Sequence, residues 1–415
     1  MEKEPLETKD EEKVEEHNGT KIEVFGVPEE KKQLTPEQLR KKKNRRKNIS
    51  NLIFLAAMTA LVLTLFLSFG ELETIGDTIK QIGNSNNWVY LLIAFVLAAA
   101  YFVLWPLTLH LFAKASSFKS TFADDFMIGS SEHFYNGITP FATGGQPFQI
   151  YSYTKCNATT AQGTGVILAN FTTYMLVTNV FALISLFFWN DFTANLSAAG
   201  EYFNSDLSWF KWVAVAGFII NFLVLLFMIA LGTSKTIRKG IYGIFHLLCK
   251  IKFIGKHLQK RLPMLDEYCN NAQTSFKEIF THWKTFIACF FIKTITMAIY
   301  YIIPFFLMKS MGLEVGYDQL YLVLFGTAFA ITAVVFVPTP GGTGGIDYAF
   351  AIVIASTVSS GLAQTQAVSL LWRLLTYYFL MLVSFIFSAL LEARITKRLK
   401  KEERLLEAKD DSQAL

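Results

Sequence analysis

Apolar runs of membrane-spanning length recur along this chain and constrain its fold more than any other feature. We predict spans at about 52–69, 88–112, 166–189, 210–231, 286–308, 320–337 and 368–391, and a shorter apolar helix at 348–357. A transmembrane α-helix needs about 20 mostly apolar residues, and 52% of the residues here are hydrophobic. The sequence therefore predicts an all-α polytopic membrane protein, with about eight transmembrane helices plus re-entrant or broken helices.

The charges outside these runs predict the orientation of the chain. Residues 1–47 are polar and expected to form a disordered tail, which ends in a basic block at 40–47 directly before the first span. The positive-inside rule places this block in the cytoplasm. The segment 396–415 after the last span is also charged. We therefore expect a multi-pass plasma membrane protein with both termini cytoplasmic and a first span that is retained.

The membrane domain is expected to cover 48–395, with a basic and amphipathic stretch inside it at 235–282. Basic residues such as Lys239 alternate there with large apolar ones such as Ile241 and Phe245. This pattern is typical of helices that lie along a membrane surface. We interpret the stretch as a cytoplasmic elbow between two groups of spans, and a small interfacial domain is the alternative.

Two stretches rich in proline and glycine interrupt the apolar sequence. The first contains Glu132, Asn136, Thr139, Pro140, Gly144, Gly145, Gln146 and Gln149, and the second contains Pro338, Pro340, Gly341, Gly342, Gly344, Gly345 and Asp347. Helical hydrogen bonding lapses at such residues. In hydrocarbon, a break survives only where it is buried in protein or lines a wet cavity. The region 126–153 is expected to be a re-entrant pair of half-helices that enters from the cytoplasmic side.

The second break has two interpretations. The N–H groups of Gly344 and Gly345 would begin the following helix and attract an anionic group. Asp347 would otherwise place its own carboxylate at this helix start, as in a tight capped turn. The glycines alone do not distinguish the two.

Charged residues inside the predicted membrane segments accompany the breaks. Glu132 belongs to the first break, Lys293 lies near the middle of a span, and Asp347 and Arg373 begin successive spans. Such charges are costly unless they are paired or hydrated, so Asp347 and Arg373 are expected to meet. Paired breaks in the two halves of a membrane region are typical of a transporter site between repeats, for example inverted repeats. Internal ion bridges that only lock the bundle are the alternative.

The cysteines and histidines give no indication of a metal site or a cofactor. Cys156, Cys249, Cys269 and Cys289 have no ligand spacing, and the six histidines show no HExxH pattern. We therefore expect neither a metal nor another cofactor.

The motif at 340–347, PGGTGGID, resembles the PGGxGxxE motif of the lysylphosphatidylglycerol synthase transmembrane-region family, with Asp347 where the family usually has Glu. The first break resembles another glycine-rich motif of that family, and Arg373 with Tyr377 resembles the arginine and tyrosine of its last span. The resemblance covers roughly residues 48 to 395. It implies a flippase-like domain of the MprF type, in a stand-alone form without the aminoacyltransferase domain.

Two departures from the family pattern matter for function. Gln146 and Gln149 stand where many relatives have charged residues, which leaves the charge of the head group open. The chain ends about twenty residues past the last predicted span, so lysyl transfer is not expected.

We expect a non-enzymatic lipid translocator, in which the residues of the two breaks, Arg373 and Tyr377 hold a phospholipid or lipid-linked head group in a polar groove. The partner would be a membrane lipid and not a nucleic acid, and a homo-oligomer is left open. An intramembrane lipid-modifying enzyme, with Glu132 and His133 as acid and base, is one alternative. A membrane scaffold for a partner synthase is the other.

Overall fold

The computed structural model describes residues 87–116, 118–193, 206–249, 262–339, 341–342, 344–357 and 362–413, together with Lys80 and Gly83. These residues belong to one compact unit, Leu61–Leu415. The predicted tail at 1–47, the first predicted span at 52–69 and Pro340 lie outside the described residues.

Five helices of the described residues are long and apolar enough to cross a membrane. They cover Trp88–Lys114, Thr160–Thr193, Phe210–Thr233, Trp283–Ser310 and Gln364–Lys401. Each overlaps one of the predicted spans, and the described residues contain helices and no strand. The prediction of an all-α polytopic membrane protein is confirmed.

The helices that form these crossings have local breaks of their own. The first consists of α3 (Trp88–Leu104) and α4 (Leu107–Lys114), which are separated at Pro106 because proline removes a backbone donor. The second is α7 (Thr160–Ser185), followed by the 3-10 turn η1 (Leu186–Phe188) and the short helix α8 (Trp189–Thr193). The third and fourth are α10 (Phe210–Thr233) and α14 (Trp283–Ser310). In the last, the π-helical turn η3 (Leu374–Phe379) separates α17 (Leu362–Arg373) from α18 (Leu380–Gln413).

Two pairs of shorter helices lie between the crossings. Helices α5 (Phe122–Gly137) and α6 (Gly145–Thr154) form the first hairpin, and α15 (Leu320–Ala333) and α16 (Gly345–Thr357) form the second. In each pair the two helices pack against each other and are joined by a Pro-Gly break. The short turn η2 (Tyr317–Gln319) precedes α15.

The predicted span at 320–337 needs a correction, because its helix ends at Ala333. The 14 residues of α15 rise by about 21 Å at 1.5 Å per residue, which is less than the hydrocarbon core of about 30 Å. Proline at 338 and the glycines after it prevent the helix from continuing. The second hairpin therefore corresponds to the first, and neither α15 nor α16 crosses alone.

The second hairpin is enclosed by other helices. Six consecutive residues of α16, from Ala349 to Ile354, are at most 1% exposed. All of them except Ala351 belong to the largest apolar cluster, together with Phe329 of α15 and Trp372 of α17. A helix that is apolar on all sides is stable when protein surrounds it on all sides. This burial places α16 inside the bundle, whereas Pro338 of the second break is exposed.

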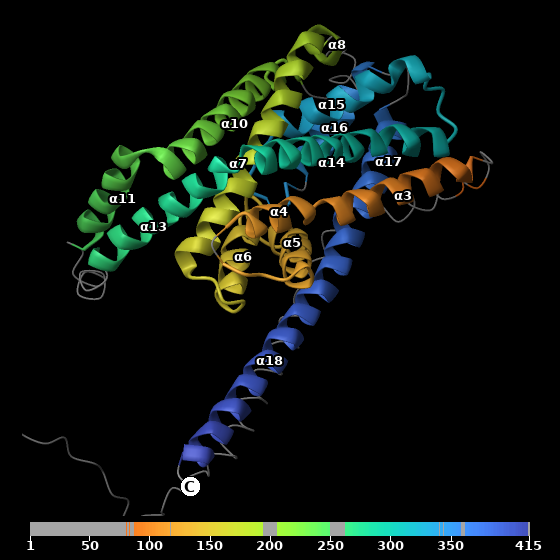
Figure 1. The fold of residues 1–415 in the computed structure, drawn as a ribbon. Coiled ribbons are helices and arrows are strands. Elements are labelled where there is room, and N and C mark those ends of the chain that lie inside the picture. Colours follow the sequence, from red (N-terminus) through yellow and green to blue (C-terminus); the bar gives the residue numbers. More distant parts are fainter. Residues whose placement is uncertain are drawn as a thin grey trace, which may run out of the picture. The chain divides into compact units, whose positions relative to one another are not determined.

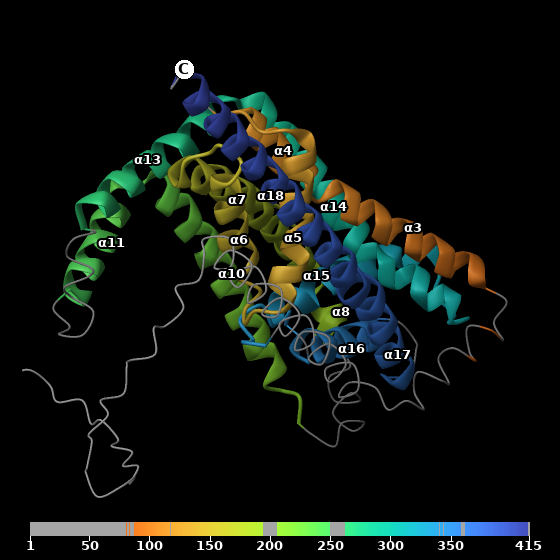
Figure 2. The ribbon, with the colours of Figure 1, turned by 90° about the horizontal axis from the view of Figure 1, so that it is seen from below.

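The order of elements is repeated in the two halves of the described chain. Helices α3–α4, the α5–α6 hairpin and α7 follow one another in the first half, and α14, the α15–α16 hairpin and α17–α18 do so in the second. Helices α3 and α14 pack side by side and run in opposite directions (Figures 1 and 2). This arrangement is the one expected of an inverted repeat.

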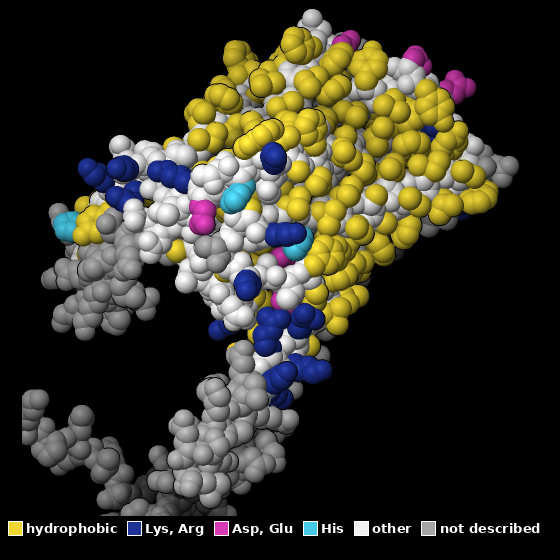
Figure 3. Space-filling view, viewed as in Figure 1, with side chains coloured by type: hydrophobic (Ala, Val, Ile, Leu, Met, Phe, Trp, Pro, Cys, Tyr) yellow, Lys and Arg dark blue, Asp and Glu magenta, His cyan; other side chains and the backbone are white. Residues whose placement is uncertain are grey.

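The surface divides by residue type. Large apolar side chains are exposed along the long helices, among them Leu92, Val96, Trp212, Phe222, Leu223, Phe291, Ile295, Leu382 and Ile386. Figure 3 shows this apolar surface, with Lys and Arg gathered at the end that carries α11 (Lys235–Leu248), α13 (Leu262–Thr281) and the later part of α18. Exposed apolar side chains in this band are suited to lipid, because a bilayer core offers no polar partners.

The predicted elbow at 235–282 contains α11 and α13, which pack side by side (Figures 1 and 2). The hydroxyl of Ser234 accepts hydrogen bonds from the amides of Thr236 and Ile237 and so begins α11. Helix α13 then leads to α14.

Candidate functional site

The first hairpin carries a buried carboxylate that neutral donors surround. Glu132 of α5 is 5% exposed. Its Oε2 accepts from the indole Nε1 of Trp105 at 2.8 Å and from the amide of Gln149 at 3.1 Å. Its Oε1 accepts from Asn136 at 3.4 Å and from Gln146 at 3.3 Å. Four predicted site residues, Glu132, Asn136, Gln146 and Gln149, therefore form one cluster.

The backbone of the first break is also satisfied by side chains of α5 and the residues just after it. The amide of Gly144 donates to Oγ1 of Thr139 and that of Gly145 to Oδ1 of Asn136, each at 2.8 Å. Thr139 in turn donates to the carbonyl oxygen of Tyr135. The tip itself is open, with the side chain of Phe141 55% exposed. Pro140 is exposed beside it.

The second break is held by charged side chains. The amide of Gly344 donates to Oδ2 of Asp347 at 2.9 Å, so the carboxylate occupies the start of α16. Arg373 lies with its Nε 3.4 Å from Oδ1 of Asp347 and donates through a terminal nitrogen to the carbonyl oxygen of Gly341 at 2.9 Å. Ser369 donates to Oδ1 of Asp347. Of the two interpretations of this break, the structure has the one in which Asp347 caps the turn.

Tyr377 joins the tips of the two hairpins. Its hydroxyl donates to the carbonyl oxygen of Gly137, the last residue of α5, at 2.7 Å. Its ring lies against Gly341, where an added Cβ would be 2.2 Å from a ring carbon. The guanidinium of Arg373 lies 4.3 Å from the centroid of the same ring. The structure therefore brings Gly341, Asp347, Arg373 and Tyr377 to the end of the first hairpin.

The two breaks repeat one sequence and begin with the same turn, which the sequence interpretation missed, although φ is −76° at Gly144 and 83° at Gly344. Residues 139–145 read TPFATGG and residues 339–345 read TPGGTGG, 200 positions apart. The hydrogen bond from Ala142 N to Thr139 O recurs as Gly342 N to Thr339 O, and that from Phe148 N to Gly144 O recurs as Tyr348 N to Gly344 O. Aligning the sequence with itself would have revealed the copy, whereas a count of prolines and glycines does not.

Both copies of the turn place two successive residues in the left-handed region of φ. In the first, φ is 56° at Phe141 and 51° at Ala142, and in the second it is 57° at Gly341 and 68° at Gly342. Only glycine adopts such angles without steric cost. The first copy is therefore strained at two residues where the second is not.

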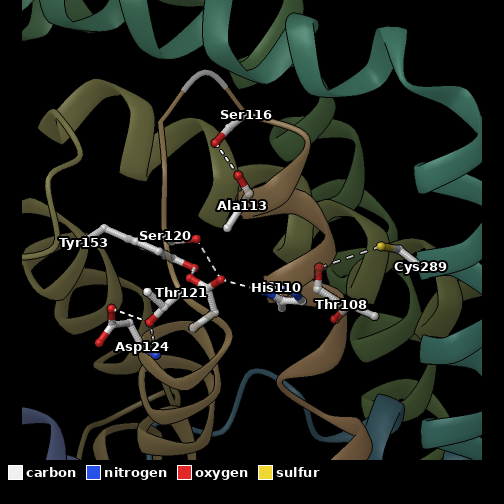
Figure 4. A network of polar contacts seen from close by, with 10 residues as sticks. Thr108, His110, Ala113, Ser116, Ser120, Thr121, Asp124, Tyr153 and Cys289 are labelled. Carbon is white, nitrogen blue, oxygen red and sulfur yellow. Dashed lines mark hydrogen bonds and ion pairs between the residues drawn. The ribbon is translucent and has the colours of Figure 1, made fainter.

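A second polar cluster fastens the base of the first hairpin, and the sequence analysis did not predict it. Figure 4 shows the part of it around His110, Asp124 and Tyr153. Asp124 accepts from Arg394 and Arg398 of α18, each at 2.8 Å. Asp125 accepts from Tyr153 at 3.0 Å and lies 2.7 Å from Nδ1 of His110. The spacing of the two arginines, one helical turn apart, was the available signal.

The two aspartates at the base of the first hairpin differ in the direction in which their pKa is shifted. Burial would raise the pKa of Asp124, but the hydrogen bonds from Arg398 and Thr121 and the charges of both arginines hold it below its usual value. Burial raises the pKa of Asp125, and its hydrogen bonds from His110, Ser120 and Tyr153 only partly oppose this. The negative charge of Asp124 therefore stabilises the fold through its ion pairs with Arg394 and Arg398.

Glu132 and His133 both lie beside Trp105 but differ in their other neighbours. Glu132 is directed to Trp105 and the glutamines, whereas the ring of His133 lies among Tyr101, Phe102 and Trp105 at centroid distances of 5.4, 5.8 and 5.0 Å. Among the described residues, no group of three His, Cys, Asp or Glu side chains is arranged to hold a metal ion.

The fold and these clusters define a class: a polytopic helical membrane protein whose two broken hairpins meet, with buried charge at both. The sequence matches the family described as lysylphosphatidylglycerol synthase TM region over residues 48–384. The chain belongs to this family. It is also similar to a UPF0104 membrane protein of Archaeoglobus fulgidus, with 22% identity over 326 residues, which are 78% of this chain and 90% of the relative.

Proposed function

We propose that this protein is a lipid translocator that moves a phospholipid or a lipid-linked head group between the leaflets of the plasma membrane. The observation that supports this most directly is the meeting of the two hairpin tips at Tyr377, with a partly buried ion pair beside one tip and a buried carboxylate beside the other. Charges inside a membrane bundle are costly and are typical of substrate paths. Family membership supports a membrane and lipid-related role.

In this mechanism the head group crosses along a polar groove between the two breaks while the acyl chains stay in lipid. The groove would spare the head group the cost of entering hydrocarbon. The amides of Gly144, Gly145 and Gly344 are bonded within the protein in the present state. A passing phosphate would therefore exchange with Thr139, Asn136 or Asp347, and Arg373 would offer it a bidentate contact once released from Asp347.

The proposed orientation follows from the distribution of charge. The end with α11, α13 and the later part of α18 carries most of the described Lys and Arg side chains visible in Figure 3. The positive-inside rule assigns such an end to the cytoplasm. The end of α18 is then cytoplasmic, and the basic block at 40–47 favours the same side for the N-terminus. The first hairpin, whose base is fastened to α18 at this end, would enter from the cytoplasmic side.

An intramembrane enzyme fits the site less well than a translocator. A general acid and base must both reach one substrate. Glu132 and His133 both lie beside Trp105, but the oxygens of Glu132 already accept from four neutral side chains and the ring of His133 lies among aromatic rings. A scaffold for a partner synthase would not require the Asp347–Arg373 pair. We therefore propose transport without lipid modification.

Reconstituted vesicles test this proposal. Purified protein should move a fluorescent phospholipid from the inner to the outer leaflet, measured by quenching of the outer leaflet, and Asp347→Asn and Arg373→Ala should abolish the movement. Asp206→Asn, a change at an exposed loop residue, serves as the control and should leave the movement unchanged. A new lipid species in mass spectra would favour the enzyme instead, and full movement in both site variants would remove the site assignment.

A further inference from the structure

Lys293 is a buried cation in the middle of α14 without a carboxylate partner among the described residues. Its side chain is 0% exposed. Its Nζ donates to the carbonyl oxygen of Trp105 at 3.4 Å and lies 3.9 Å from the centroid of the Trp105 ring. An ammonium has three N–H donors, and one long hydrogen bond with an aromatic face leaves this group short of acceptors.

Lys293 lies next to the point where Pro106 interrupts the first crossing. The carbonyl oxygen of Trp105 lies between α3 and α4, where it accepts from Thr108 and from Lys293. Helix α5 approaches the same point closely, because a Cβ at Gly129 would be 2.6 Å from Cβ of Pro106. The lysine therefore lies beside the first hairpin.

Glu132 attracts Lys293 but does not satisfy it. The negative charge of Glu132 acts on Lys293 through space, and no hydrogen bond joins the two side chains among the described contacts. The oxygens of Glu132 already accept from Trp105, Gln149, Asn136 and Gln146. Trp105 lies between the two charges, with its indole N–H bonded to Glu132 and its ring face and carbonyl oxygen offered to Lys293.

A second polar atom near Lys293 also has no partner. Nε2 of His133 is buried and makes no hydrogen bond within the described part of the chain. The ring of His133 lies 5.0 Å from that of Trp105, and the charge of Lys293 acts on it. Two buried nitrogens beside one indole thus lack polar partners that buried groups normally have: Lys293 has one long hydrogen bond, and Nε2 of His133 has none within the described part of the chain.

We propose that Lys293 is the receptor for a phosphate group, and that Trp105 holds the ammonium while no phosphate is present. A phosphate supplies the negative charge and the several oxygens that the ammonium lacks. His133, protonated at Nε2, donates to the same group. This inference rests on the proposed function, since it takes the phosphate to be that of the transported lipid. Lys293 is inaccessible in this state, so binding accompanies a displacement of the first hairpin.

Lipid binding to the purified full-length protein tests this site. The thermal midpoint is titrated in detergent with phosphatidylglycerol, with diacylglycerol of the same acyl chains, and with glycerol 3-phosphate. We expect phosphatidylglycerol to raise the midpoint and the other two compounds to have little effect. A rise with glycerol 3-phosphate equal to that with phosphatidylglycerol would assign the phosphate to a soluble ligand, and an equal rise with diacylglycerol would overturn the proposal.

Substitutions at Lys293 sharpen the test. Lys293→Gln should weaken the binding of phosphatidylglycerol about tenfold to a hundredfold, the value of a charge-assisted hydrogen bond, and Lys293→Arg should retain part of it. Lys293→Met, which needs no partner when buried, replaces the Gln variant if that variant does not fold. Asp206→Asn is the control. Unchanged binding in a folded Gln or Met variant would remove the site.

The two proposals fail separately. If vesicles show no lipid movement while phosphatidylglycerol binding still depends on Lys293, the proposed function is wrong and the phosphate site remains. If lipid moves and neither movement nor binding depends on Lys293, the function remains and the site is wrong.

Discussion

The two breaks share one turn but are held in different ways. In the first, the neutral side chains of Thr139 and Asn136 satisfy the glycine amides, and the tip exposes Phe141. In the second, Asp347 and Arg373 hold the turn, and the ring of Tyr377 covers Gly341. The repeated sequence thus forms one break held by neutral side chains with an exposed tip residue, and one held by a charged pair with Gly341 covered by a ring. The backbone hydrogen bonds present in both breaks are the ones that the turn itself needs. The side-chain contacts that differ fit each break to its own neighbours.

The largest effect should come from removing the charge that holds the second copy. Arg373→Ala leaves Asp347 without its cation and Gly341 without its side-chain donor, and breaking a buried pair costs about 3–5 kcal/mol. Because the side chain of Asp347 is 22% exposed, we expect the lower part of this range. Thermal unfolding in detergent measures the loss, and Asn136→Ala in the neutral copy, which lacks such a charge, should cost less.

Gly341→Ala should have the next largest effect. The added Cβ would meet the Tyr377 ring at 2.2 Å, and φ of 57° is unfavourable for alanine. Overpacking and the left-handed conformation together cost about 2–4 kcal/mol. The matched variant Phe141→Ala keeps a Cβ at the equivalent position and should be nearly neutral in the unfolding midpoint. Equal losses in the two variants would contradict the difference between the copies.

Tyr377→Phe should have a smaller effect, because it removes only the hydrogen bond between the tips. The ring still covers Gly341, whereas the carbonyl oxygen of Gly137 loses its donor. We expect a loss of about 1 kcal/mol in the free energy of unfolding and a clear change in the rate of lipid movement. A rate equal to that of the wild type would show that this contact between the hairpins is not used in transport.

Phe141→Gly should have the smallest effect on stability, and in the opposite direction. Glycine relieves the cost of φ at 56° but adds freedom to the unfolded chain, so a net gain of up to about 1 kcal/mol is expected. If the exposed ring takes part in transport, lipid movement falls while the unfolding midpoint rises. A lower midpoint would mean that Phe141 packs in a way the second copy does not require.

The sequence predicted the helices better than it predicted the contacts. Five spans, the helix pair α5 and α6 and the position of both breaks follow from apolar length and from proline and glycine positions. The end of α15 at Ala333 was not predicted, because the apolar run continues to Val337 and its length does not show where the helix stops. Asp347 with Arg373 was predictable because both are charged residues inside membrane segments.

Other parts of the site depend on packing that no local pattern encodes. Gln146 and Gln149 were identified from the motif, but their shared acceptor Glu132 became evident only when α5 and α6 packed together. Trp105 is one aromatic residue among many in the sequence. Its role between Glu132 and Lys293 depends on the crossing of α3, α5 and α14 near Pro106.

The π-helical turn η3 determines which way the side chains of α18 face relative to those of α17. Arg373 precedes it and Tyr377 lies within it, whereas Ser384, Arg394 and Arg398 follow it and bond to α5. Each residue of an α-helix adds about 100° of rotation. Deleting one residue at Leu375 would leave Arg373 in register with the second hairpin but turn the arginines of α18 away from Asp124. One residue in this turn thus lets a single helix serve both hairpins.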